Sequence, residues 1–122
     1  MGPSPRFYIK NHKAVFYSMS NATVTAEPIA GVCFMVDGSE NFKHIKPDRF
    51  IDGNWCFDIA KVKRELKINY IEIVYVPDTD YILICDEEAL LVNEPTQNFL
   101  ATILAGFPIY GNVLYCHTSA VN

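Results

Sequence analysis

Residues 70–85 read YIEIVYVPDTDYILIC, and they carry the clearest structural signal in the chain. Two runs rich in β-branched and aromatic side chains, residues 70–76 and 81–85, flank the turn-forming segment Pro77-Asp78-Thr79-Asp80. This pattern predicts two antiparallel strands joined by a tight connection. The hairpin favours a fold built on an antiparallel sheet.

Short helices are predicted on both sides of this hairpin. The first covers about residues 58–67, where Asp58 is suited to be the N-cap and apolar residues recur at helical spacing. The second covers about residues 95–105, with Pro95 suited to the first turn and Gly106 just after the end.

The remaining strands are predicted mainly in the first half. Residues 1–40 alternate and turn like a β-meander, with strands at residues 6–10, 13–18 and 22–26 and a central strand at residues 29–36. Residues 110–117 form the last predicted strand. Residues 37–57 contain several turn dipeptides and are predicted to be a loop, pinned to the core by apolar side chains, namely Phe42, Ile45, Phe50 and Trp55.

These elements predict a single α+β domain over residues 1–122. The sheet is predominantly antiparallel, residues 1–40 are a β-meander extension, and residues 58–117 form the core. A chain of 122 residues with 50% hydrophobic and 20% charged residues is long enough for one such domain and too short for two.

The sequence also limits the cellular compartment and the kinds of catalytic or metal site that can be expected. The chain has no apolar run of 18 residues and no signal-peptide pattern, so a cytoplasmic protein with four reduced cysteines is expected. It has no zinc-ligand spacing, phosphate-binding loop or nucleophile motif. We therefore predict no catalytic residue, no metal site and no cofactor.

Charge is divided unevenly along the chain. Residues 1–67 hold all ten Lys and Arg and seven acids, whereas residues 68–122 hold seven acids and neither Lys nor Arg, a balance of −7. An acidic half argues against a long nucleic acid as a partner, whereas a small anionic ligand could use the basic half. Opposite charges could equally give register to a homo-oligomer, or simply neutralise each other within one domain.

Four stretches of the second half resemble, in the same order, the motifs of one protein family. They are residues 70–75 (YIEIVY), 84–90 (ICDEEAL), 98–102 (NFLAT) and 109–114 (IYGNVL). The family comprises small phage, plasmid and bacterial proteins known only as a domain of unknown function, with the corresponding motifs GGYIEVV, NEEGKL, NPxAT and GDVV. The resemblance covers about residues 58–116 and implies a fold and a phage or mobile-element origin.

Seven residues are candidates for binding a ligand or partner: Trp55, Tyr70, Glu72, Asp86, Glu87, Asn98 and Thr102. Asp86, Glu87 and Glu88 form the densest acid cluster, although acids in a solvated turn are common. Asn98 and Thr102 are four residues apart and share a helical face, either for a ligand or as an exposed polar stripe.

The function expected from these features is binding without catalysis. Given the implied origin, the protein would counter a host defence by binding a host protein or by sequestering a small signalling molecule. A homo-oligomer is expected, and no membrane partner. The alternative is a small enzyme that uses the acids of residues 86–88, with or without a divalent metal.

Overall fold

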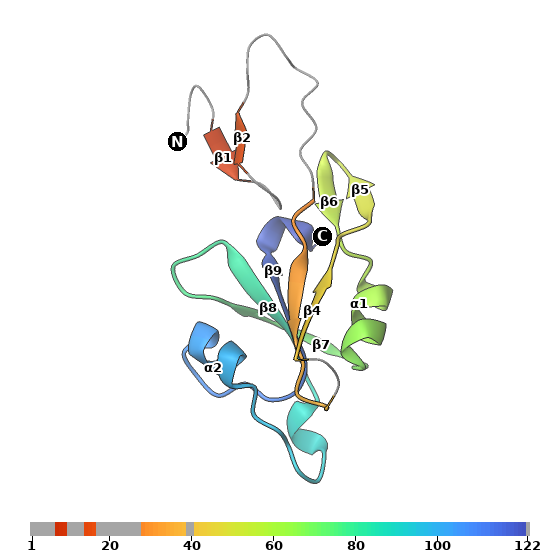
Figure 1. Ribbon diagram of the computed structural model, residues 1–122, viewed down its shortest axis with the longest axis vertical. Coiled ribbons are helices and arrows are strands. Elements are labelled where there is room, and N and C mark those ends of the chain that lie inside the picture. The colour runs from red at the N-terminus through yellow and green to blue at the C-terminus, as the bar shows by residue number, and fades with distance from the viewer. Residues whose placement is uncertain (1–6, 10–13, 17–27, 39–40, 122) are drawn as a thin grey trace.

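A five-stranded antiparallel sheet is the centre of this computed structural model, which describes residues 7–9, 14–16, 28–38 and 41–121 (Figure 1). Every neighbouring pair in the sheet is antiparallel. The strands lie in the order β4 (Phe42–Ile45), β3 (Gly31–Phe34), β9 (Val113–His117), β8 (Tyr81–Asp86) and β7 (Ile71–Tyr75). The predicted hairpin of residues 70–85 is confirmed as β7 and β8.

The two helices lie on opposite sides of this sheet (Figure 1). Helix α1 (Ile59–Leu66) contributes Val62 and Leu66 to one core cluster, and α2 (Phe99–Ala105) contributes two alanines to the other. Alternate residues of β8 enter the two clusters, Ile82 with α1 and Leu83 with α2, because neighbouring side chains of a strand point to opposite faces. The predicted α+β class is confirmed.

Helix α1 begins where its sequence indicates. The Asp58 carboxylate accepts a hydrogen bond from Ala60 N at 3.1 Å and so caps the first turn.

Two short 3₁₀ helices complete the fold, η1 (Ala89–Leu91) after β8 and η2 (Thr118–Ala120) after β9. No helix in the part of the chain that the structure describes is long and apolar enough to cross a membrane.

The prediction of a loop over residues 37–57 is wrong for about half of that segment, which forms strands. Strand β4 joins the central sheet there, and β5 (Arg49–Ile51) pairs with β6 (Asn54–Cys56) in a separate hairpin. Asp52 and Gly53 connect that hairpin with φ angles of +52° and +83°, the conformation that tight two-residue hairpin loops require. Ile45 is buried as predicted, but Phe42 and Phe50 are 51% and 54% exposed and do not pin a loop to the core.

The second helix is shorter than predicted. It begins at Phe99 rather than near Pro95, because Asn98 is the N-cap and Gln97 forms an isolated bridge with Tyr110. At the N-terminus, β1 (Phe7–Ile9) and β2 (Ala14–Phe16) pair antiparallel as predicted, and the predicted strand at residues 22–26 lies outside the described residues.

Candidate functional site

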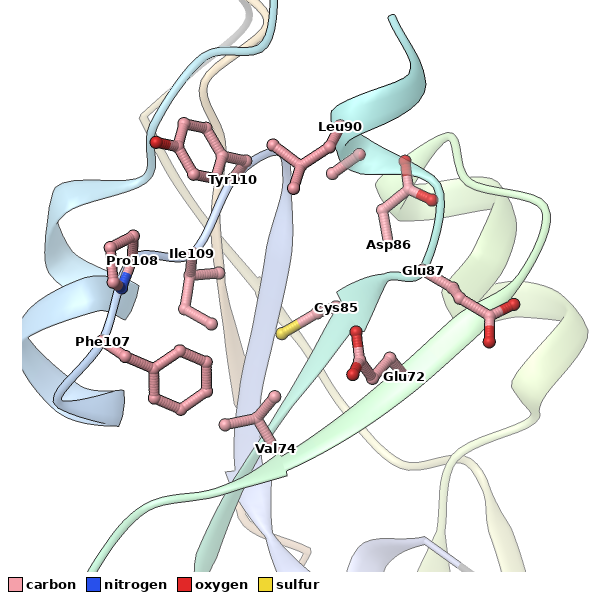
Figure 2. Close-up of a pocket in the computed structure, with 11 residues that line it drawn as sticks. Glu72, Val74, Cys85, Asp86, Glu87, Leu90, Phe107, Pro108, Ile109 and Tyr110 are labelled. Atoms are coloured by element: carbon pink, nitrogen blue, oxygen red, sulfur yellow. The ribbon is translucent and has the colours of Figure 1, made fainter.

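Three of the predicted site residues line one surface depression of about 110 Å³, which we call the acid-rimmed depression (Figure 2). It lies between the β7–β8 hairpin and the segment that follows α2. Its acidic side consists of Glu72, Asp86 and Glu87. Its other lining residues are mainly apolar: Val74, Cys85, Ala89, Leu90, Phe107, Pro108, Ile109 and Tyr110.

The acidic side is held by the end of the hairpin. Glu72 pairs in register with Cys85, so both lie on the face of the sheet that α2 also covers. Asp86 accepts a hydrogen bond from Glu88 N at 2.9 Å, and Glu87 N donates to the Tyr70 carbonyl at 3.1 Å. These bonds turn the chain from β8 into η1. They also fix the backbone positions from which the Asp86 and Glu87 side chains extend.

The apolar side requires a close approach of two backbone segments. Gly111, with φ of +85°, follows the segment after α2, and a Cβ at this position would lie 3.4 Å from the Ala89 side chain of η1. Glycine therefore suits the left-handed conformation at this position. Leu90 of η1, which is 65% exposed, and Phe107, which is 49% exposed, both line the apolar side of the depression.

The carboxylates of the acid-rimmed depression have no cationic partner among the residues that the structure describes. The ion pairs found there join Lys43 with Glu65, Lys61 with Asp48, and Lys67 with Asp37. Lys67 does border a neighbouring depression together with Asp86, but its Nζ lies 2.9 Å from Asp37 Oδ2. The depression therefore combines uncompensated negative charge with an apolar surface.

The thiol that lines the depression is not an activated nucleophile. Burial, with the nearby carboxylates of Glu72 and Asp86, raises the pKa of the Cys85 thiol to about 12, so it stays protonated and a poor nucleophile at neutral pH. Figure 2 shows the Glu87 carboxylate directed away from the Cys85 thiol. Within the described ranges, no three His, Cys, Asp or Glu side chains are grouped so that they could hold a metal ion.

Asn98 and Thr102 do not join this site, and they have structural contacts instead. The Asn98 side chain, 2% exposed, donates to the carbonyls of Phe34 and Gly111 at 3.0 and 2.9 Å and accepts from Ala101 N at 3.1 Å. The Thr102 hydroxyl accepts from Ile109 N at 2.9 Å. Their common face is turned inward, and the exposed side of α2 is apolar.

Trp55 and Tyr70 are also apart from the acid-rimmed depression. Trp55 lies on the β5–β6 hairpin, toward the opposite end of the central sheet from η1, with its ring centroid 5.1 Å from that of Phe50 (Figure 1). Tyr70 is 57% exposed and lies just before β7, where its carbonyl, rather than its ring, contacts the turn at Glu87.

Leu90 and Phe107 were not predicted as site residues. Each follows a polar or turn segment as part of a short apolar run that resembles ordinary core sequence, and only their exposure in the folded chain distinguishes them. One sequence feature could have identified Leu90 as a candidate: the apolar run of residues 89–92 directly follows three consecutive acids.

Comparison with protein-family models, with curated proteins and with solved structures finds no match to this chain. The family resemblance of residues 58–116 accordingly remains a prediction. The structure shows an α+β fold whose surface carries the acid-rimmed depression.

Proposed function

We propose that this protein acts by binding another protein through the acid-rimmed depression, without catalysing a reaction. The observation that carries the proposal is the pairing of uncompensated carboxylates with exposed apolar side chains, Leu90 and Phe107, around one small depression. Exposed apolar groups beside charges that lack a partner are typical of a recognition surface.

The size of the depression supports a macromolecular partner. Pockets for small molecules usually enclose about 300–1,000 Å³, whereas this depression measures about 110 Å³. Such a volume accommodates one side chain of a partner. The surrounding exposed groups then provide the larger contact that a protein complex needs.

The chemistry of the walls selects the kind of side chain. A lysine or arginine can lay its aliphatic stem on Val74, Leu90 and Phe107 while its charged end reaches the carboxylates of the rim. The target is therefore a protein segment that presents a basic residue next to apolar ones.

The biological setting of this proposal comes from the resemblance of residues 58–116 to phage and mobile-element proteins. In that setting the target is a host protein, and binding it counters a host defence. Sequestration of a small signalling molecule receives less support, because such molecules are commonly anionic and the depression is acidic. Self-association also belongs to the proposal and uses a different surface, described in the next subsection.

Selection of binders from a random peptide library on the immobilised full-length protein tests the proposed recognition. We expect the enriched peptides to carry Lys or Arg beside an apolar residue. Their binding should weaken at least tenfold when Glu72 and Glu87 are both replaced by Gln, and also in the variant Leu90→Asp. Binding should weaken as salt is raised, because exposed charges contribute to it.

The matched control is Asp78→Asn, which removes an acid of the same half of the chain in the β7–β8 turn. Asp78 has φ of +62°, a conformation that Asn adopts readily, so the turn is preserved. This variant should bind the selected peptides like the wild type. Enrichment of peptides without basic residues, or unchanged binding after loss of both glutamates, would contradict the proposal.

A further inference from the structure

We infer that two copies of this chain associate through the outer face of α2, in a two-fold symmetric dimer. This surface is separate from the acid-rimmed depression, so the inference does not depend on the proposed target. It consists of four exposed side chains: Phe42 of β4 and Phe99, Leu100 and Ile103 of α2. We call it the α2 face.

Every side chain of α2 except that of Thr102 is apolar, although the fold covers only one side of the helix. Its sequence, FLATILA, places Ala101 and Ala105 in the core and leaves Phe99 69% and Ile103 75% exposed. A helix that is hydrophobic all round is normally buried all round. The outward side chains of α2 therefore lack the cover that their composition indicates.

The α2 face carries a ridge and a groove side by side. The ridge is formed by Phe99 and Ile103, one helical turn apart. The groove, of about 260 Å³, lies where the start of α2 meets β3 and β4, and its apolar lining includes Phe34, Phe42 and Leu100. A symmetric interface requires both complementary shapes on the same patch, because each copy contacts the other with the same residues.

The absence of charge supports a second copy as the occupant. Residues 95–122 contain no Asp, Glu, Lys or Arg, so α2 and the segments next to it carry no acidic or basic side chain other than that of His117. A charged patch repels its own copy, whereas an uncharged one does not. Depletion of charged residues is also characteristic of the buried centre of homodimer interfaces.

The exposed apolar area would form the centre of such an interface, and the surrounding residues would have to supply the rest. The four side chains of the α2 face expose on the order of 400 Å², about half of the ~800 Å² that each partner contributes to a standard interface. Neighbouring polar residues such as Asn41 and Gln97, which also line the groove, can supply a rim.

Sedimentation velocity on the full chain tests the dimer. At about 100 µM we expect twice the mass of one chain, in both about 0.1 M and about 1 M NaCl, because an uncharged apolar contact is not screened by salt. Ile103→Glu should raise the dissociation constant about 100-fold or more, since a two-fold interface contains each substitution twice. Phe42→Gln, on a different element, should also weaken the dimer.

Tyr75→Glu is the matched control, because Tyr75 is 71% exposed and lies on β7, away from the α2 face. It should leave the dimer intact, and near-UV circular dichroism should show that each variant is folded. The inference is overturned if the wild-type chain sediments as a monomer at this concentration. It is equally overturned if Tyr75→Glu dissociates the dimer as strongly as Ile103→Glu, or if high salt alone dissociates it.

Discussion

At the residue scale, Asn98 connects three parts of the fold. One amide side chain binds the end of β3, the segment before β9 and the first turn of α2, while almost completely buried. Its two donors and one acceptor are matched to two carbonyls and one N–H group. The side chain therefore determines how α2 sits on the sheet.

We predict that Asn98→Asp destabilises the protein by about 2–4 kcal/mol. The carboxylate can still accept from Ala101 N, but it cannot donate to the carbonyls of Phe34 and Gly111, and its charge is buried against their oxygens. Urea unfolding of the full chain measures the loss. The same substitution at the exposed Asn93 should change the free energy of unfolding by less than about 0.5 kcal/mol. Equal effects at the two positions would contradict the structural role of Asn98.

At the element scale, the sequence predicted what is local and long enough to leave a periodic signal. The hairpin of residues 70–85 and helix α1 each carry their own turn or cap, so neighbouring residues were sufficient. Strands β4, β5 and β6 have three or four residues each, too short for a clear alternation. The start of α2 depends on contacts of Asn98 with residues 34 and 111, which are distant in the sequence.

Only the acidic part of the candidate site was predicted from the sequence, because the apolar part depends on contacts between distant residues. Acids in a strand-ending turn are conspicuous in a sequence, and two of them, Asp86 and Glu87, line the depression together with Glu72 of β7. Leu90 and Phe107 approach that depression from η1 and from the segment after α2, and only the tertiary fold determines that they remain exposed.

The junction of β9 with η2 contains a proton-sensitive contact. His117 is 8% exposed, and its Nδ1 accepts a hydrogen bond from Ser119 N at 3.1 Å, which requires that this nitrogen carry no proton. Burial lowers the pKa of His117, and this effect exceeds the opposing influence of Asp80. Protonation therefore removes the cap of η2.

We predict that the melting temperature falls between about pH 7.5 and about pH 5.5 in part because of His117. Because the folded-state pKa lies below the unfolded value, the contribution of His117 is complete above the unfolded pKa and is lost as pH falls toward the folded one. His117→Asn keeps a side-chain acceptor for Ser119 N without the titration, so its melting temperature should vary less with pH. His44→Asn, at an exposed position of β4, should retain the wild-type dependence. An unchanged pH profile in His117→Asn would refute this assignment.

At the scale of the whole molecule, the fold shields every cysteine. Cys33, Cys56, Cys85 and Cys116 are all free and buried. Burial raises the pKa of Cys33 to about 11 and that of Cys116 to about 12, and it also raises the pKa of Cys56. Thiolate, the reactive form, is therefore scarce at neutral pH.

We predict that all four thiols react with Ellman's reagent at least about a hundredfold more slowly in the native protein than in the unfolded one. The absorbance released in native buffer, compared with that in denaturant, measures the protection. Addition of denaturant should expose all four groups at once if the domain unfolds cooperatively. One thiol that reacts quickly in native buffer would show that the region around it opens independently.

The place of β9 in the sheet has a consequence for how the chain reaches its folded state. The hairpins β3–β4 and β7–β8 form from nearby residues, but β9 alone joins them, pairing Cys33 with Leu114 on one side and Ile84 with Leu114 on the other. On the ribosome the two hairpins can exist before β9 has been synthesised, yet the sheet cannot close. Closure then has to bridge a long stretch of chain, and such high contact order slows folding. Until residue 117 has emerged, the inner edges of both hairpins are open to pairing with other chains.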